Sequence, residues 1–190
     1  LLKEQIDGRI HCSFNTMGTE TGRFSCSEPN LQQIPSKTIE SRRIREAFIG
    51  NLLVADYSNV ELRLLAHYSK DPKLLAVYRD GGSGDLHAET GKLLGIPRSQ
   101  AKTINFGISY GMGPGKLAES LGISEIEADL LIKKWYSTYC MVQPWKDMIV
   151  NTCLKYGFVR SLGGRKRRIE MDAGRLKWAR KVGATTSEMR

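Results

Sequence analysis

The sequence has 190 residues, 41% of them hydrophobic and 26% charged, a balance that excludes wholesale disorder and fits one domain or two small ones. It carries 29 Lys and Arg against 20 Asp and Glu, so its net charge is +9 and a polyanion such as nucleic acid is the expected partner. No apolar run reaches the roughly 18 residues that a membrane span needs, so a soluble protein is expected.

The cysteines and the first residues indicate where the protein works. Cysteines stand at positions 12, 26, 140 and 153, without the C-x-x-C spacing of zinc sites or the density of a disulfide scaffold. We therefore expect free thiols in a reducing compartment. The sequence starts with Leu1 and shows no signal segment, which predicts a domain edge at this point. These features together predict an intracellular protein.

The first third of the sequence has weak periodicity. Residues 9–14 alternate in polarity as a half-buried strand does. Residues 16–35 are rich in Gly, Ser, Thr, Asn and Pro and predict a long loop. Long loops inside compact domains are often functional, so this segment is a candidate binding surface, with a plain connector as the alternative.

A strand followed by a helix is predicted around Asp56. Residues 51–58 form a short apolar run that ends at this carboxylate, which predicts a buried strand with Asp56 at its carboxyl end. From Asn59 the apolar period becomes helical, and Ser58 or Asn59 can cap the helix while Glu61 lies in its first turn. A carboxylate between a strand and a helix is a typical arrangement for the edge of an active site.

Helices dominate the rest of the sequence. Apolar periods, with Asp71 at one helix start, Asp85 as a cap and Ser124 with Glu127 as a capping box, predict them over about residues 72–78, 85–94, 98–111, 114–121, 124–139, 144–156 and 175–190. Residues 157–169 predict a basic β-hairpin around a Gly-Gly turn. Residues 160–190 contain ten basic and three acidic residues, so this tail carries +7 of the net charge. The predicted fold class is α+β, mostly helical.

The most informative pattern is a four-residue stripe, defined as Arg98, Lys102, Phe106 and Tyr110. At intervals of four, these residues form one gently spiralling line on a helix, about 18 Å long. Two cations followed by two aromatic rings match the phosphates and the base of a nucleoside triphosphate. An amphipathic helix with a solvated basic end is the alternative on spacing alone.

These residues resemble the family A DNA polymerases, the group of bacterial DNA polymerase I and many phage enzymes. Residues 56–63 (DYSNVELR) resemble motif A, and the four-residue stripe with the glycine after it resembles motif B on the fingers O-helix. Residues 21–23 and 29–35 resemble the segment along the primer-template minor groove, and residues 157–168 resemble the fingers hairpin. The four matches occur in the family's order and span nearly the whole sequence.

The resemblance implies an enzyme of template-directed DNA synthesis that uses two Mg²⁺ ions. Asp56 would bind both ions with help from the backbone carbonyl of Tyr57. Arg98 and Lys102 would hold the β- and γ-phosphates, and Lys102 could protonate the departing pyrophosphate. His87 would be a further triphosphate contact, with a surface or core histidine as the alternative.

The resemblance also implies how the incoming nucleotide is selected. Phe106 would pack on its sugar and base, and Glu61 would be a steric gate against the 2′-hydroxyl of a ribonucleotide. Tyr110 would support that gate and lie near the template base. Ser58 and Asn59 are included in the same dNTP site. Glu61 as a plain helix-terminal charge and Tyr110 as core packing are the alternatives.

Contacts with duplex DNA are implied for a separate set of residues. Arg23, Asn30 and Gln32 would read minor-groove acceptors that all base pairs share, as a sequence-independent enzyme requires. Tyr110 and Gly111 would lie against the template strand. The expected partners are therefore primer-template DNA and dNTPs.

The same resemblance divides the chain and exposes departures from the family pattern. Residues 1–61 would be a partial palm, and residues 62–190 would be the fingers. The second metal-binding carboxylate of the family, in its His-Asp-Glu motif C, is not found in the sequence, nor is the thumb or an exonuclease. The chain alone is therefore expected to be inactive and to require a C-terminal palm segment as partner. Only ten residues separate His87 from Arg98, which resembles phage-like members.

Two other functions fit parts of the pattern. A single-subunit RNA polymerase has a related Lys and Tyr-Gly arrangement, but the motif around Asp56 and the presence of Phe106 argue against it. A DNA- or dNTP-binding module of a split polymerase would bind substrates without catalysis. Preference for ribonucleotides would favour the first alternative, and template-primer binding without extension would favour the second.

Overall fold

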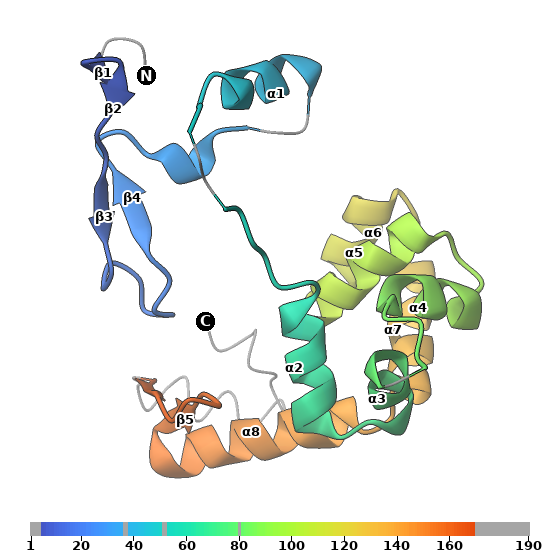
Figure 1. Ribbon diagram of the computed structural model, residues 1–190. Helices are drawn as coiled ribbons and strands as arrows, with labels where there is room; N and C mark the ends of the chain where they lie inside the picture. Colours follow the sequence, from blue (N-terminus) through green and yellow to red (C-terminus); the bar gives the residue numbers. More distant parts are fainter. Residues whose placement is uncertain (1–4, 36–37, 51–52, 80, 170–190) are drawn as a thin grey trace. The chain divides into compact units, whose positions relative to one another are not determined.

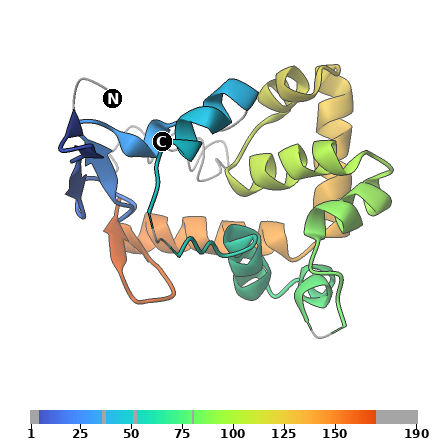
Figure 2. The same cartoon turned by 45° about the horizontal axis from the view of Figure 1, so that its top comes forward.

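The computed structural model describes residues 5–35, 38–50, 53–79 and 81–169, which form two compact units (Figures 1 and 2). The first unit is Leu1–Asp56 and the second is Tyr57–Arg190. The helix predicted over residues 175–190 falls outside the described residues. Within the described ranges, no helix combines the length and the apolar character that crossing a membrane requires.

The first unit consists of two small hairpins, a 3-10 turn and one helix. Its elements are β1 (Gln5–Ile6), β2 (Arg9–Ile10), β3 (Ser13–Asn15), β4 (Ser25–Ser27), η2 (Leu31–Gln33) and α1 (Ile39–Glu46). Strands β1 and β2 pair antiparallel with Gln5 opposite Ile10, and β3 pairs with β4 with Phe14 opposite Cys26.

The prediction of one strand over residues 9–14 was wrong. The chain forms β2, leaves the strand at residues 11–12 and enters β3 as part of a separate hairpin. The first hairpin turns at Asp7 and Gly8, which both have positive φ, 52° and 71°. An Asp-Gly pair favours such a two-residue turn. The long loop expected over residues 16–35 is also interrupted, by β4 and η2.

Helix α1 was not expected from the sequence, because it is mostly polar. It begins with a capping box, in which Thr38 Oγ1 accepts a hydrogen bond from the Ser41 backbone N–H and Ser41 Oγ accepts one from the Thr38 N–H. The two isoleucines of the helix, Ile39 and Ile44, are 72% and 44% exposed. Local capping therefore specifies this helix more than an apolar face does.

The buried strand predicted over residues 51–58 was also wrong. Residues 53–57 are irregular, and Leu53 and Val54 are 96% and 89% exposed. A buried strand needs partners for its backbone N–H and C=O groups. Among the described residues, strand pairing occurs only within the three hairpins.

The second unit is a helical assembly with a basic hairpin. Its elements are α2 (Val60–Ser69), α3 (Pro72–Tyr78), α4 (Leu86–Leu94), α5 (Arg98–Ser109), α6 (Pro114–Leu121), α7 (Glu125–Thr138), α8 (Val142–Tyr156), β5 (Phe158–Arg160) and β6 (Lys166–Arg168). In Figure 1, α4 lies along α5, and α2 lies near the long helix α8, in agreement with the packing of these pairs. The mostly helical α+β class is confirmed.

One apolar core holds these helices together. Leu62 of α2, Leu74 of α3, Leu86 of α4, Ile104 of α5 and Trp135 of α7 are each fully buried. Burying a large apolar side chain contributes about 1.5–3 kcal/mol. Because these side chains come from five separate helices, their burial favours one arrangement of the helices. The core therefore fixes α2, α4 and α5 relative to one another.

Three predicted helix starts agree with observed side-chain caps, but the cap expected from Ser58 or Asn59 is absent at α2, and α8 begins at Val142, two residues before the predicted position 144. Asp71 Oδ1 accepts from the Lys73 and Leu74 backbone N–H groups, and Asp85 Oδ1 accepts from that of Ala88. Ser124 and Glu127 form the expected capping box at the start of α7. The basic hairpin is confirmed as well, with Val159 of β5 opposite Arg167 of β6.

Candidate functional site

Helix α5 exposes the four-residue stripe and buries its opposite face. Arg98, Lys102 and Tyr110 are exposed and Phe106 is partly buried, as the four-residue spacing predicts. The buried face consists of Ala101, Ile104, Asn105, Gly107 and Ile108. The stripe thus presents two cations on the first turns of the helix and two aromatic rings at its end.

The helix is slightly shorter than the predicted range of 98–111. It ends at Ser109, and Tyr110 is the capping residue with φ −92° and ψ 4°. Gly111 follows with φ +77°, and the Met112 backbone N–H donates to the Gly107 carbonyl at 2.8 Å. A Cβ on Gly107 would lie 2.9 Å from the Met112 sulfur. Gly107 therefore permits the chain to fold back against the end of α5.

Glu61 and Tyr110 meet across two helices. The Tyr110 hydroxyl donates a hydrogen bond of 2.7 Å to Glu61 Oε1, joining the first turn of α2 to the end of α5. Hydrogen bonds to a carboxylate are short and comparatively strong. This contact fixes the direction of the Glu61 side chain, which a helix-terminal charge alone would leave free.

Arg98 is held by a carboxylate that the sequence analysis treated only as a helix cap. Arg98 Nε lies 2.8 Å from Asp85 Oδ2, while Asp85 Oδ1 caps α4. The hydrogen bond from Arg98 lowers the pKa of Asp85 below its ordinary value. The pair uses one of the five N–H donors of the guanidinium. Sequence spacing gives no signal for this contact, because thirteen positions separate the two residues.

His87 is buried, and its surroundings disfavour a positive charge. The side chain lies in the first turn of α4, is 2% exposed, and has its ring centre 5.4 Å from that of Phe106. Burial lowers the pKa of His87, and the nearby charges of Arg98 and Lys102 lower it further, against the opposing effect of Asp85. The structure thus places the surface of α5 and the start of α4 in one cationic, ring-lined region of the second unit.

Asn105 was missed by the sequence analysis. Its side chain is fully buried on α5 and hydrogen-bonds to His87, Thr90 and Trp135. An asparagine inside a helix has low helix propensity, and this is the one sequence signal that could have drawn attention to it.

The candidate contacts with duplex DNA, Arg23, Asn30 and Gln32, belong to the first unit, and local hydrogen bonds hold Asn30 and Gln32. Asn30 Oδ1 accepts from the Gln32 backbone N–H at 3.0 Å and caps η2. Gln32 Nε2 donates to the Phe24 carbonyl at 3.1 Å. Arg23, Asn30 and Gln32 are all exposed. These bonds fix the segment that presents the three side chains.

Asp56, Tyr57 and Ser58 lie in an exposed stretch between α1 and α2. Arg63 Nε donates to the Ser58 carbonyl at 3.0 Å, and Asn59 adopts a left-handed conformation with φ 53° before α2 begins. The Asn59 side chain makes no capping bond. Within the described part of the chain, no three His, Cys, Asp or Glu side chains gather as a metal site would require.

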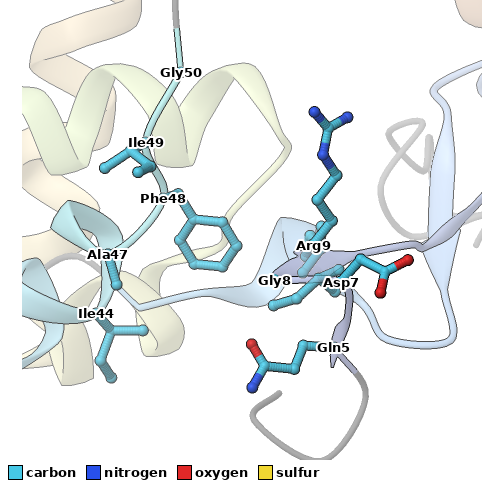
Figure 3. A pocket seen from close by; sticks show the side chains of 11 residues that line it. Gln5, Asp7, Gly8, Arg9, Ile44, Ala47, Phe48, Ile49 and Gly50 are labelled. Atoms are coloured by element: carbon cyan, nitrogen blue, oxygen red, sulfur yellow. The ribbon is translucent and has the colours of Figure 1, made fainter.

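The first unit also contains a pocket that none of these residues lines. It has a volume of about 870 Å³ and lies between the turn at Asp7 and Gly8 and the segment that includes Ile44 and Phe48 (Figure 3). Its apolar side chains come chiefly from α1 and the residues after it. No residue assigned to substrate, metal or DNA on sequence grounds lines it.

Known proteins are similar to this chain over nearly its whole length. Residues 1–185 match the family described as DNA polymerase family A. The chain is 41% identical over 188 residues to the thermostable DNA polymerase I of Thermus aquaticus and 39% identical over 202 residues to DNA polymerase I of Synechocystis. These alignments cover 92% and 99% of this chain, but 22% and 20% of those proteins, so the chain spans about a fifth of their length.

A solved structure gives the same relationship. The POL domain of Pol1 from M. smegmatis, in complex with DNA primer-template and dNTP, is 30% identical in sequence and has a TM-score of 0.81. The match covers 99% of this chain and 36% of that chain. The relatives named here are bacterial, and the phage-like character inferred from the spacing stays a prediction.

Proposed function

We propose that this chain, which belongs to DNA polymerase family A, binds a deoxynucleoside triphosphate along α5 and acts in template-directed DNA synthesis. The reaction would be transfer of a nucleotide from the dNTP to a primer 3′-OH. Residues 1–61 would contribute to the palm, and residues 62–190 would form the fingers.

The observation that carries the proposal is the surface formed by α5 with α2 and α4. Arg98 and Lys102 offer cationic donors at one end, while Phe106 and Tyr110 offer rings at the other. The ion pair with Asp85 uses the Nε–H of Arg98 and orients the guanidinium. The terminal N–H groups of Arg98 are therefore the donors proposed for phosphate. Lys102 is the proposed donor of a proton to the departing pyrophosphate.

Selection of the sugar is proposed for Glu61. Its carboxylate is held by the 2.7 Å hydrogen bond from Tyr110, so it occupies a defined position beside the aromatic end of the stripe. A fixed side chain can exclude a 2′-hydroxyl by occupying its space, whereas a mobile one would move aside. Phe106 would pack against the sugar and base, and Ser58 and Asn59 would border the same dNTP site.

Mg²⁺ is the proposed cofactor, but the described residues account for only part of its site. The exposed Asp56 carboxylate and the adjacent Tyr57 carbonyl are oxygen ligands of the kind that Mg²⁺ prefers. A pair of ions would need further oxygens, from substrate phosphates and a second carboxylate, since no cluster among the described residues completes the set. When bound, Mg²⁺ supplies positive charge to the triphosphate and to the attacking oxygen.

Primer-template DNA is the proposed macromolecular partner. Arg23, Asn30 and Gln32 are proposed to contact the duplex, and Tyr110 and Gly111 the template. The local bonds of Asn30 and Gln32 support this role by fixing the backbone of their segment. The structural relative from M. smegmatis was solved with primer-template and dNTP, which supports the same class of partner for this chain.

The test is titration of the chain with dATP after replacement of single cations. Arg98→Ala and Lys102→Ala are each expected to weaken binding about 10-fold or more, because a hydrogen bond to a charged group contributes about 1.5–3 kcal/mol. Lys92→Ala is the matched control, since Lys92 is an exposed lysine of α4 paired with Glu89. Equal affinity for all four proteins would contradict the proposed triphosphate site.

Nucleotide selection separates the proposed function from its alternatives. In a polypeptide that contains this chain and extends primers, dNTPs should be preferred over rNTPs, and Asp56→Asn should abolish extension while DNA binding persists. A preference for rNTPs would indicate an RNA polymerase instead. Binding of template-primer and dNTP without extension in every polypeptide that contains this chain would indicate a binding module.

A further inference from the structure

A buried hydrogen-bond chain links the core of the second unit to His87. Trp135 Nε1 of α7 lies 2.8 Å from Asn105 Oδ1 of α5, and Asn105 Nδ2 lies 3.1 Å from His87 Nδ1 of α4. All three side chains are 2% exposed or less. These hydrogen bonds therefore connect three helices without contact with solvent.

The direction of each bond follows from the chemistry of the groups. The indole N–H of Trp135 can only donate, so the Asn105 atom that faces it must be the carbonyl oxygen. The amide nitrogen of Asn105 then faces His87, and it too can only donate. His87 Nδ1 must therefore be an unprotonated acceptor. The proton of a neutral ring is consequently on Nε2.

Thr90 completes the hydrogen bonding of the amide. Its hydroxyl lies 3.2 Å from Asn105 Oδ1, 3.1 Å from Asn105 Nδ2 and 2.8 Å from the Tyr139 hydroxyl. The hydroxyl can donate to the first atom and accept from the other two, so every donor and acceptor of the Asn105 amide has a partner. Rotation of the amide would place Asn105 Nδ2 against the Trp135 N–H, which disfavours the flipped orientation.

The remaining nitrogen of His87 is the one atom of this group without a partner. His87 Nε2 is buried and makes no hydrogen bond with any described residue. An unsatisfied buried N–H is uncommon in proteins and calls for an explanation such as a ligand or a water. It lies in the region where Arg98 and Lys102 are near enough to influence the His87 ring.

We propose that Asn105 is a positioning residue that holds His87 as a neutral imidazole with its proton on Nε2, the donor for a phosphate oxygen of the bound nucleotide. The part of this inference that concerns the phosphate rests on the proposed function. The part that concerns the proton rests on the Trp135 and Asn105 contacts alone.

The charges around His87 agree with a neutral donor. Arg98 and Lys102 of α5 disfavour an imidazolium, and Asp85 before α4 favours one, but burial is the largest influence and it opposes the charge. Trp135 of α7 and Tyr139, the residue that caps the end of α7, add no charge at neutral pH, since burial raises the pKa of Tyr139. A neutral Nε2–H can donate to phosphate at any pH above the lowered pKa of His87. An imidazolium would instead lose one of its protons as the pH rises above its pKa.

The first test is the tautomer of His87, measured by long-range ¹⁵N–¹H correlation on the 190-residue chain. The sequence has three histidines, and His11 and His67 are exposed, so they serve as references in the same spectrum. We expect one protonated nitrogen in His87, at Nε2, and a pKa below the ordinary value for histidine. A proton on Nδ1 at neutral pH would overturn the inference.

Two variants separate positioning from general destabilisation. Asn105→Asp places a carboxylate oxygen opposite Nδ1, so the proton should move to Nδ1 and the pKa of His87 should rise above its ordinary value of about 6.5. Simple unfolding would bring that pKa only to the ordinary value. Thr90→Val, the control, removes a hydroxyl but keeps the contacts of Asn105 with Trp135 and His87, and should retain the Nε2–H tautomer. A pKa in Asn105→Asp that stays low would contradict the inference.

The second test uses dATP as the probe. Its addition should shift the His87 Nε2 signal and leave the His67 signals in place. If His87 has the Nε2–H tautomer and dATP leaves its signal unchanged, the positioning by Asn105 stands and the phosphate contact is wrong. If the proton of His87 is on Nδ1, Nε2 has no proton to donate to phosphate, and both the positioning and the phosphate contact are wrong.

Discussion

The two units of this chain are stabilised in different ways. In the first, Cys26 is the one buried apolar side chain among the described residues, and Phe14 and Ile49 are 59% and 91% exposed. In the second, helices α2 to α8 bury a continuous core around Leu62 and Trp135. Short hairpins and single caps hold the first unit, whereas packing between distant segments holds the second.

This difference also applies to the candidate site residues, which are held in place differently in the two units. Glu61, His87 and Arg98 come from three helices of the second unit, and the core fixes their mutual geometry. In the first unit, Asn30 and Gln32 are fixed by bonds to residues at most eight positions away. The site geometry of the second unit is therefore a property of tertiary packing, and that of the first is a property of local turns.

A matched pair of leucine substitutions tests the comparison with the largest expected effect. Leu62 is 0% exposed in the second unit and Leu53 is 96% exposed in the first. Leu62→Ala should lower the free energy of unfolding by about 2–5 kcal/mol, because it removes buried contacts and leaves a cavity. Leu53→Ala should change it by less than about 0.5 kcal/mol. The measurement is urea unfolding followed by circular dichroism.

Equal destabilisation by the two substitutions would contradict the contrast between the units. Ile126→Ala is a useful control within the second unit, because Ile126 is 76% exposed on α7. It should behave as Leu53→Ala does. A large effect of Ile126→Ala would show that exposure in this structure does not predict the energetic contribution of a side chain.

The second prediction concerns Lys146, a partly buried lysine of the second unit. Burial lowers the pKa of Lys146 to about 8, and its Nζ donates to the Ile108 carbonyl at 2.7 Å and to the Tyr136 hydroxyl at 3.0 Å. Between pH 8 and the ordinary value of 10.5, the unfolded chain binds more protons than the folded one, so this residue makes stability rise with pH. The contribution is complete above 10.5 and is lost as the pH falls to 8.

Lys146→Met isolates that contribution. The free energy of unfolding of the wild-type chain should gain roughly 2–3 kcal/mol relative to the variant between pH 8 and 10.5. Each protein should be unfolded in urea at several pH values in this range. Lys133→Met is the control, because Lys133 is an exposed lysine of α7 paired with Asp129. A difference between wild type and Lys146→Met that does not change with pH would contradict the lowered pKa.

The ends and order of the helices were predictable from sequence because their signals are local. Asp71, Asp85 and Ser124 cap helices where expected, and Gly95 closes α4 with φ 75°. Caps depend on a few adjacent residues, so spacing and residue type suffice. The same reason explains why the basic hairpin was found.

The failures arose where the outcome depends on distant segments. The apolar run before Asp56 favours a strand, but a strand forms only if another strand pairs with it, and this information is not in the run. Helix α1 was missed because its stabilising contacts are polar. The Arg98 contact with Asp85 and the bonds of Asn105 join separate helices, so no spacing rule reveals them. The stripe was visible because all four members lie on one helix.

The third prediction tests whether a single contact in the packed unit controls sugar selection. Tyr110→Phe removes the hydroxyl that donates to Glu61 at 2.7 Å. The carboxylate should become less well placed, and the preference of the chain for dATP over ATP should fall by about 3- to 10-fold, since an exposed charge-assisted bond contributes about 1 kcal/mol. The measurement is the ratio of the two dissociation constants.

Tyr156→Phe is the matched control for that substitution. Tyr156 of α8 is 57% exposed, as Tyr110 is, but lies outside the proposed nucleotide site. It should leave the ratio unchanged. If both variants change the ratio equally, the Glu61 contact does not account for the selection.

The smallest expected effect comes from a capping motif that both units contain. Both α1 and α7 begin with a capping box, formed by Thr38 with Ser41 and by Ser124 with Glu127. Replacing the first residue of either box with alanine should cost about 1 kcal/mol locally. All tryptophans of the sequence lie after residue 57, so their fluorescence reports the second unit. Ser124→Ala should shift the fluorescence transition, and Thr38→Ala should not.

The outcome of the capping experiment distinguishes two forms of cooperativity. If the units unfold independently, Thr38→Ala shifts only a transition seen by proteolysis near α1, where few buried contacts oppose opening. If the chain unfolds as one body, both variants shift the fluorescence midpoint by the same amount, because each cap then contributes to a single free energy. We expect the first result, since the core that couples α2 to α8 takes none of its buried side chains from the described residues before Tyr57.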